Sequence, residues 1–446
     1  MDKIAEQLYL DFYRATPTLS DASTLQRFGT FHDSLRAPIH RWFKYPAGYS
    51  YKLVYAFIDS YHLTSQHWIL DPFVGCGTTS VAAKERGVNS IGIEAHPFVH
   101  WVAQVKTFWE YDLERLHRRI LTLINALHKQ LEQSSDVDIS TFPSLLHRCY
   151  SPTNLARLKV IRDTIESFDC LEEERNFFRL ALTDTLRTAS SAGTGWPYIA
   201  PSQYHAKQER DALEAFIEQI QIMYDDLKQI HYKSRPDVET RLLLRDARDP
   251  YPVENDSIEM AITSPPYLNN YDYADRTRLE MYFWGWAQSW REITEKVRDK
   301  LITAATTQIR RTRFPDSPLD PDIALLNKQV YLELETKVRE LEQRRLSKGG
   351  KKSYDLMVAG YFNDMVQVLK QVYRVLKPEA PFILVLGDSA PYGIHIPTED
   401  YLGKLGIGIG FHDYHIHHLR TRGDKWGHNP QRHKVALKES LLILEK

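Results

Sequence analysis

A serine followed by two prolines and a tyrosine, at positions 264 to 267, has the residue types best suited to chemistry. Two consecutive prolines stiffen the backbone and lack N–H groups, so the carbonyl of Pro265 is expected to point outward. The hydroxyl of Ser264 and that carbonyl can accept hydrogen bonds from an exocyclic amine, and Tyr267 offers a flat face for stacking. The alternative interpretation is a Pro-Pro turn that only ends a strand.

A glycine-rich turn between two predicted strands is the second feature of this kind. Gly75 and Gly77 would let the backbone pass close to a ligand. Thr78 or Thr79 can cap the helix that follows. Glu94, at the end of the next strand, can accept hydrogen bonds from two ribose hydroxyls. The arrangement fits NAD or S-adenosylmethionine, and a tight turn without a ligand is the alternative.

An acid in front of the glycines favours S-adenosylmethionine over a dinucleotide. Asp71, followed by Pro72 and Phe73, would repel a phosphate and suit a cationic amino group, which the methionine moiety offers. No Gly-Lys-Ser/Thr follows the turn, which excludes a P-loop. Asp246 ends one predicted strand and Ser-Pro-Pro-Tyr ends the next, so both should lie where open parallel sheets bind ligands.

The rest of the chain supplies the elements that must position these residues. Short apolar runs bounded by turn residues predict buried strands, and several are followed by helical patterns such as Thr79 to Arg86. This alternation predicts an α/β fold with a parallel sheet and helices on both faces. The predicted strands are Trp68 to Leu70, Ser90 to Ile93, Arg241 to Leu244, Ile258 to Thr263, Phe382 to Leu386, Tyr414 to Leu419 and Leu441 to Leu444.

Two long stretches with helical spacing interrupt the alternation and are predicted to be insertions. For the first, additional core packed against the sheet is an equally good interpretation. The predicted division is 1–110 for the first half of the sheet domain with the segment before the glycine-rich turn, 111–237 for a helical insertion, 238–275 for the part with Ser-Pro-Pro-Tyr, 276–353 for a helical and basic insertion, and 354–446 for the C-terminal part.

The charge of the chain leaves nucleic-acid binding open. The 446 residues include 57 Lys and Arg against 58 Asp and Glu, which excludes a histone-like polycation but not a local basic cleft. Two basic clusters in the second insertion suit phosphate contacts, and solvated loops are their alternative. The clusters comprise Arg310, Arg311 and Arg313, and then Arg344, Arg345, Lys348, Lys351 and Lys352.

Composition also bears on compartment and metal binding. Three scattered cysteines are too few for a disulfide framework or a four-ligand zinc site, so a reducing cytoplasm is expected. The first residues lack an uninterrupted apolar stretch, and no run of 18 apolar residues predicts a membrane span. Histidines 412, 415, 417 and 418 alternate along a predicted strand and would point to both faces, so no metal site is predicted.

Taken together, the motifs resemble the exocyclic-amino DNA methyltransferases, which make N4-methylcytosine or N6-methyladenine. DPFVGCGTT, Glu94, RDAR and TSPPY are similar to motifs I, II, III and IV of that family, and HRWFKYPAGYSYKLVYAFID is similar to its motif X. YRVLKPEAPFILVLGD and ESLLILEK resemble later parts of the same fold. In the unpermuted motif order a target-recognition domain is expected between motifs III and IV, whereas the long helical stretch here lies between II and III.

The resemblance implies an α/β, Rossmann-like, seven-stranded methyltransferase sheet with two mainly helical insertions. It implies S-adenosylmethionine as cofactor and double-stranded DNA as substrate, with cognate restriction or defence components as possible partners and no membrane. The implied catalytic residues are Ser264, Pro265, Pro266 and Tyr267, and the implied cofactor contacts are Asp71, Phe73, Gly75, Gly77, Thr78, Glu94 and Asp246.

The activity implied is direct methyl transfer to the amine of a flipped base, without a covalent enzyme intermediate. Cytosine C5 methylation is set aside because the chain has no Pro-Cys pair. Serine at position 264 is commoner in the family where cytosine N4 is the target, so N4-methylcytosine is expected over N6-methyladenine. An RNA amino-methyltransferase and a non-catalytic recognition subunit that keeps the fold are the further alternatives.

Overall fold

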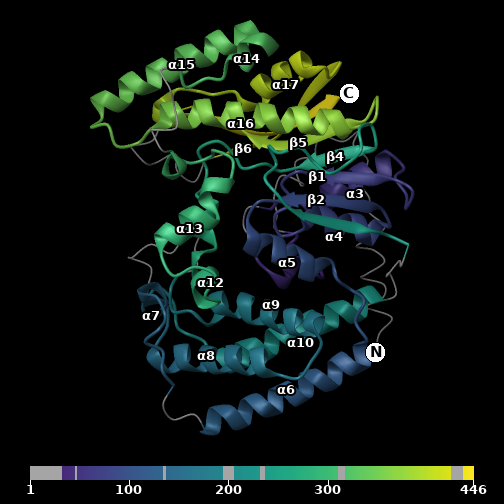
Figure 1. Cartoon of the computed structure of the whole chain (residues 1–446), viewed down its shortest axis with the longest axis vertical. Coiled ribbons are helices and arrows are strands. Elements are labelled where there is room, and N and C mark those ends of the chain that lie inside the picture. The colour runs from purple at the N-terminus through teal and green to yellow at the C-terminus, as the bar shows by residue number, and fades with distance from the viewer. Residues whose placement is uncertain are drawn as a thin grey trace.

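A seven-stranded sheet forms the centre of the computed structural model, in the order β3-β2-β1-β4-β5-β7-β6 (Figure 1). Each of the seven predicted strands is confirmed. The structure describes residues 33–45, 48–133, 137–193, 205–231, 237–309, 317–422 and 435–446. The strands are β1 (Trp68–Asp71), β2 (Asn89–Glu94), β3 (Thr240–Leu244), β4 (Met260–Thr263), β5 (Pro381–Gly387), β6 (Asp413–Arg422) and β7 (Leu437–Glu445).

One strand departs from the predicted parallel arrangement. β7 runs antiparallel to both of its neighbours, β5 and β6, whereas the other neighbouring strands pair in parallel. β6 and β7 are consecutive in the chain, and no helix of the described residues lies between them. A chain that returns directly to the neighbouring position pairs antiparallel, because a parallel neighbour needs a crossover connection.

The period of two along the strands distributes the core over both faces of the sheet. Ile69 and Ile262 pack with α3 and α4, while Leu70 and Ala261 pack with α16 and α17 on the opposite face. α5 lies against α4 and β3. The helices around the sheet are α3 (Tyr51–Ser60), α4 (Thr78–Arg86), α5 (Pro97–Thr107), α16 (Tyr354–Val375) and α17 (Thr398–Ile409).

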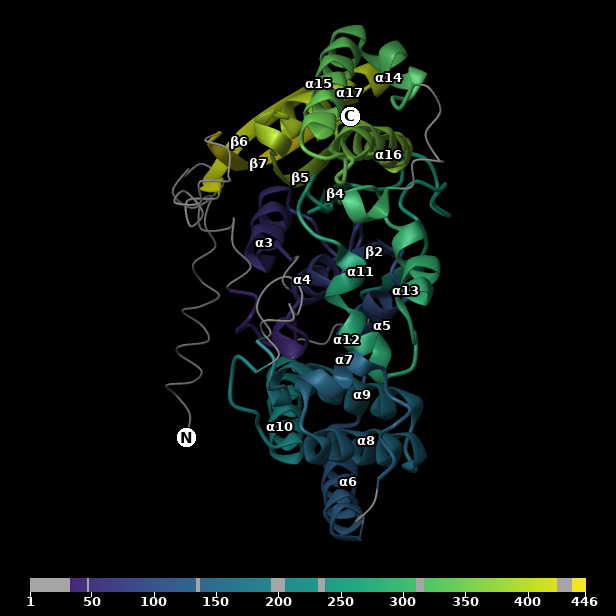
Figure 2. The same ribbon diagram turned by 90° about the vertical axis from the view of Figure 1, so that its left-hand side faces the viewer.

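The residues between β2 and β3 form a helical bundle that lies beyond α5 from the sheet (Figure 2). In α6 the buried residues Leu116, Ile120, Leu123 and Leu127 follow at helical spacing, so one face packs on the bundle and the other is exposed. The bundle helices are α6 (Leu113–Gln133), α7 (Ser144–Cys149), α8 (Pro152–Ser167), α9 (Glu172–Ala189) and α10 (Ala212–His231).

Some of the helices after the Ser-Pro-Pro-Tyr loop pack on the helical bundle, and others pack on the sheet domain. Phe283 and Ile293 belong to the core of the bundle, whereas α15 packs on α16 at the opposite end of the molecule. None of the helices in the described ranges is both long and apolar enough to span a membrane. These helices are α11 (Tyr273–Arg276), α12 (Arg278–Phe283), α13 (Trp290–Lys296), α14 (Pro321–Leu326) and α15 (Lys328–Ser347).

Candidate active site

A cavity at the carboxyl ends of β1, β2 and β4 brings together residues that are far apart in the sequence. It holds about 800 Å³ of space, part of it open to solvent. Of the predicted site residues, Phe73, Gly75, Thr78, Glu94, Asp246, Ser264 and Pro266 line it. Asp71, Gly77, Pro265 and Tyr267 lie outside its wall. The glycine-rich turn and the Ser-Pro-Pro-Tyr loop therefore border one space.

The two glycines of the turn have different surroundings. Gly75 has φ of 55°, and a methyl group there would meet no atom closer than 3.9 Å. Gly77 has φ of 89° and lies against α5, where a methyl group would come within 3.3 Å of Ala103. Gly75 thus opens the cavity, while Gly77 allows the turn to approach α5. Gly77 is also the N-cap of α4, so neither threonine caps that helix, contrary to the prediction.

The carboxylate of Asp71 is hydrogen-bonded to other groups of the protein. Its side chain is 1% exposed, and its carboxylate accepts hydrogen bonds from the Thr263 hydroxyl (2.6 Å), the Phe73 amide (2.9 Å) and the Thr79 hydroxyl. Burial raises the pKa of the Asp71 carboxyl to about 6. This acid joins the glycine-rich turn to the end of β4, whereas the sequence suggested a direct contact with a cationic ligand.

The Glu94 carboxylate connects the glycine-rich turn to the chain that follows β2. One carboxylate oxygen accepts from the amide of Gly75 at 3.1 Å and the other from the amide of His96 at 2.8 Å. A carboxylate has about four lone-pair sites, so two acceptor sites remain for a ligand in the cavity. Burial raises the pKa of the Glu94 carboxyl to about 7, against the opposing effect of these two amides.

Asp246 lines the cavity next to a basic partner. Arg248 donates to its carboxylate from the backbone amide and from Nε, both at 2.9 Å. The same guanidinium reaches Asp364 of α16 at 2.9 Å. These contacts fix the orientation of the Asp246 carboxylate at the end of β3, and the guanidinium bridges that strand to α16.

The serine and the tyrosine of the Ser-Pro-Pro-Tyr loop have different surroundings, although their side chains also interact with each other. Ser264 lines the cavity, and its hydroxyl donates a long hydrogen bond of 3.5 Å to the carbonyl of Val385. Tyr267 is only 9% exposed, and its hydroxyl donates to the buried carboxylate of Glu439 at 2.8 Å. The guanidinium of Arg422 lies 5.0 Å from the centre of the tyrosine ring and covers it.

Several wall residues were not singled out from the sequence. Tyr45 and Tyr49 line the cavity, and their signal was the segment that resembles motif X. Tyr273, shortly after the Ser-Pro-Pro-Tyr loop, and Lys300 and Ile302 of the second insertion also line it, and no motif marks them. No group of three or more His, Cys, Asp or Glu side chains within the described ranges is arranged to hold a metal ion.

A second, more polar groove lies beside the Ser-Pro-Pro-Tyr loop, and part of one basic cluster lines it. Its wall includes Lys348, Lys351 and Lys352 from the connection between α15 and α16, together with Arg422 and Asn270. The three lysines therefore lie where the sequence suggested phosphate contacts, next to the loop with the catalytic residue types.

The remaining basic residues are placed differently. Arg345 is 5% exposed and pairs with Asp355 at 3.4 Å and Glu342 at 3.3 Å, so its guanidinium is not available to a phosphate. Arg344 donates to the carbonyl of Tyr392 at 2.6 Å. The cluster of Arg310, Arg311 and Arg313 lies outside the described residues.

Comparison with known proteins gives the family. A family model described as DNA methylase matches residues 13–104, which include the glycine-rich turn and Glu94. Two full-length relatives are the type II methyltransferases M.BsoBI of Geobacillus stearothermophilus and M.AvaI of a Nostoc species. The first is 25% identical over 99% of this chain and 91% of its own length, and the second 27% over 92% and 86%.

These similarities support the assignment of the chain to the exocyclic-amino DNA methyltransferase family. Members of this family take the methyl group from S-adenosylmethionine. The family model ends before the Ser-Pro-Pro-Tyr loop, so it is the full-length alignments that extend the relationship across the whole methyltransferase. A third relative, M.MthZI of Methanothermobacter thermautotrophicus, is 47% identical over 51 residues, 11% of this chain.

Proposed function

We propose that this methyltransferase transfers a methyl group from S-adenosylmethionine to the N4 amine of cytosine in double-stranded DNA, as the modification activity of a restriction-modification or defence system. The observation that carries the proposal is the single cavity shared by the Gly75 turn, Glu94 and Ser264. A group that binds the cofactor ribose and a group that holds an amine thereby face one space.

The residues of the cavity fit the cofactor. Glu94 retains acceptor sites for two ribose hydroxyls, Asp246 can accept from the adenine amine, and Phe73 supplies an apolar wall. Tyr45 and Tyr49 contribute aromatic surface to the wall of the same cavity. When bound, S-adenosylmethionine supplies an electrophilic methyl group on its sulfonium sulfur.

The affinity for S-adenosylmethionine should rise about tenfold between pH 6 and pH 8. Ribose hydroxyls donate to the ionised carboxylate of Glu94, so they favour the ionised form. With a pKa of about 7, this carboxyl is mostly protonated at pH 6 and mostly ionised at pH 8. Calorimetric titrations at both pH values measure the change. Glu94→Gln is the control and should remove the pH dependence; an equally steep dependence in that variant would assign it to another group.

At the other end of the cavity, the chain would hold the base by its amine. The hydroxyl of Ser264 and the carbonyl of Pro265 would accept hydrogen bonds from the two amine hydrogens. These two bonds would orient the lone pair of the amine nitrogen. Orientation and electrostatic complementarity then supply the catalysis, and no side chain forms a bond to the base.

Stacking on Tyr267 requires a movement. Arg422 covers the ring, and glycine at position 387 leaves room for both side chains, because a methyl group there would lie 3.0 Å from Cδ2 of the tyrosine and closer still to the arginine. Arg422 also lines the lysine-containing groove. We expect the phosphates of bound DNA to draw this guanidinium away, so that the base takes its place.

Replacing Lys348, Lys351 and Lys352 together by Ala should flatten the salt dependence of DNA affinity. Each phosphate contact contributes about 0.9 to the slope of log affinity against log salt concentration, so the slope should fall by about 2 to 3. Fluorescence anisotropy over a range of salt concentrations measures it.

The matched control removes the same charge from the outer surface of the bundle, at Arg118, Arg119 and Lys129 of α6. That variant should keep the wild-type slope. Equal slopes for both triple variants would show that the lysines are an ordinary surface loop.

Nucleoside mass spectrometry tests the proposed reaction directly. The protein is incubated with labelled S-adenosylmethionine and duplex DNA, and the DNA is digested to nucleosides. N4-methyldeoxycytidine is the expected product, with bulk RNA as the control substrate. N6-methyldeoxyadenosine alone would overturn the choice of base and leave the DNA amino-methyltransferase activity standing; label in RNA alone would overturn the substrate.

A further inference from the structure

The chain from Ile39 to Tyr45 leads into the wall of the cofactor cavity. His40 contacts Glu85 of α4 and Lys106 of α5, whereas other polar contacts of the segment run to the helical bundle and to α11. We propose that α9 and α10 position this segment over the cavity, so that the bundle sets the affinity for S-adenosylmethionine. The inference rests on the proposed function, since it takes the cavity to be the cofactor site. It assigns to the first insertion a role other than reading DNA.

Asp226 of α10 holds the start of the segment. Its carboxylate is fully buried, and one oxygen accepts from the amide of Ile39 and from Nε1 of Trp42, both at 3.0 Å. Nε of Arg41 donates to the same oxygen at 3.0 Å. Three residues of the segment are thereby tied to one carboxylate 184 to 187 positions later in the chain.

Ile39 shows that this contact constrains the backbone. Its φ is 61°, in the left-handed region that a β-branched residue rarely adopts. Such a conformation persists where the surroundings over-determine it, and it is typical of functional positions. The hydrogen bond from its amide to Asp226 is one of the contacts that hold it there.

Lys44, next to the cavity residue Tyr45, is held from two sides. Asp184 of α9, 3% exposed, accepts from the Lys44 amide at 3.3 Å and from its Nζ at 3.4 Å. Arg276 of α11 donates to the Lys44 carbonyl at 3.1 Å. Both peptide groups of this residue are therefore engaged immediately before the chain enters the cavity wall.

A buried ion pair connects these two contacts. Arg187 of α9, one turn from Asp184, donates to the fully buried Glu280 of α12 at 2.7 Å and to the carbonyl of Arg276 at 2.7 Å. The bundle, α11 and the Lys44 backbone thus belong to one network, rather than forming separate surface contacts.

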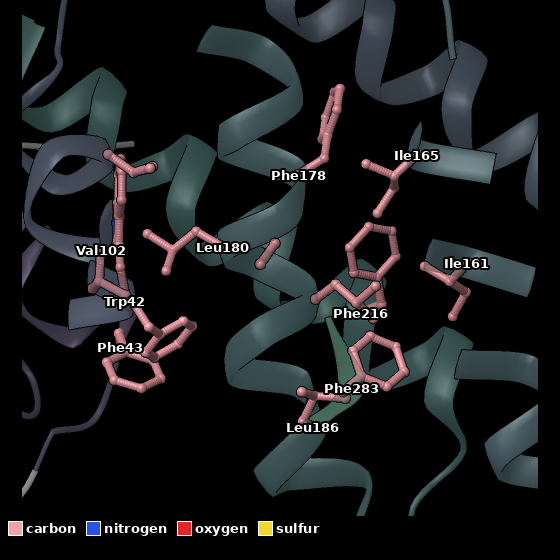
Figure 3. Packing of buried hydrophobic residues seen from close by; sticks show 14 of the residues in the cluster. Trp42, Phe43, Val102, Ile161, Ile165, Phe178, Leu180, Leu186, Phe216 and Phe283 are labelled. Atoms are coloured by element: carbon pink, nitrogen blue, oxygen red, sulfur yellow. The ribbon is translucent and has the colours of Figure 1, made fainter. Parts of the chain in front are cut away.

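Apolar packing follows the same path. Trp42 and Phe43 are buried beside Val102 of α5 and Leu180 of α9 (Figure 3). The rings of Trp42 and Phe177 meet edge to face at 5.7 Å. Burying carboxylates stabilises a fold weakly compared with apolar packing, but removing one partner is costly, so such networks can specify a single arrangement. Here the arrangement specified is that of the cavity wall.

The test compares a buried and an exposed carboxylate of α10 in the full-length protein. Asp226→Asn should weaken S-adenosylmethionine binding at least about tenfold in calorimetry without DNA and raise the KM for the cofactor. The kcat at saturating cofactor and the KM for DNA should stay at wild-type values. Glu218→Gln is the matched control, because that carboxylate is exposed and pairs with Arg210 at 2.7 Å; it should change neither constant.

Arg41→Gln tests the same contact without altering a buried group, because the Arg41 side chain is 30% exposed. It should shift the cofactor affinity in the same direction, including where Asp226→Asn fails to fold. Wild-type affinity in Arg41→Gln, or equal changes in the KM for cofactor and for DNA, would overturn the proposal and leave the proposed function intact. Absence of cofactor binding by the wild-type protein would overturn both.

Discussion

Ser264→Ala should lower the turnover number for DNA methylation by about 10- to 150-fold, while the affinity for S-adenosylmethionine stays unchanged. In the proposed mechanism the hydroxyl holds the amine of the target base, and a hydrogen bond of this strength contributes about 1.5–3 kcal/mol. Its contacts in the protein are a long hydrogen bond to Val385 and an interaction with the Tyr267 side chain, which Glu439 also holds, so its removal should leave the loop in place. Single-turnover rates and calorimetry measure the two quantities.

A serine away from the cavity provides the control. The hydroxyl of Ser257 donates to the carbonyl of Glu254 in the connection before β4, so Ser257→Ala should methylate DNA at the wild-type rate. If Ser264→Ala retained full turnover, or if it lost cofactor affinity in parallel with turnover, the serine would not be the group that holds the amine.

Tyr267→Ala should have the largest effect on stability among the loop variants, lowering the free energy of unfolding by about 3–5 kcal/mol. The ring is packed in the core with residues such as Val385 and Leu441, and its hydroxyl serves the buried Glu439. Methylation should also fall, since stacking of a base on an aromatic ring contributes about 1–3 kcal/mol. Denaturant unfolding and methylation rates at a temperature where the variant is folded separate the two effects.

Tyr267→Phe distinguishes the ring from the hydroxyl. Phenylalanine keeps the stacking face, and Glu439 keeps its contact with Arg420. The expected cost is therefore about 1–3 kcal/mol of stability, with turnover near the wild-type value. A phenylalanine variant as inactive as the alanine variant would mean that the hydroxyl, rather than the face, is the functional part of Tyr267.

The second insertion shows how a sequence pattern can differ from the packing of the same residues in the structure. The sequence predicts residues 276–353 as a helical and basic insertion. In the structure α12 joins the core of the bundle, while α15 packs on α16 across the sheet. The apolar residues of each helix indicate that one of its faces is buried. They do not indicate which element packs on that face, because this depends on which apolar surface the rest of the fold leaves exposed.

Local patterns in the sequence are enough to predict the strands, the helices and the class of reaction. The strands are short apolar runs between turn residues, and the glycine-rich turn and Ser-Pro-Pro-Tyr are contiguous motifs, so local spacing is sufficient to find them. The carboxyl-end rule for parallel sheets then predicted that Asp246 and the Ser-Pro-Pro-Tyr loop would both lie where such sheets bind ligands. These features depend on neighbours in the chain and on general sheet geometry.

The three-dimensional packing, in contrast, determines which polar groups are free to contact a ligand and which already bind other groups of the protein. Asp71 accepts from Thr263, 192 residues away, Arg345 is buried against Asp355, and Asp226 holds Ile39. Residue type is the same for an engaged and a free carboxylate, and a pair so distant in sequence leaves no periodic signal. Its existence follows from the packing of whole elements, because burial obliges each charged group to find a partner wherever the fold brings one.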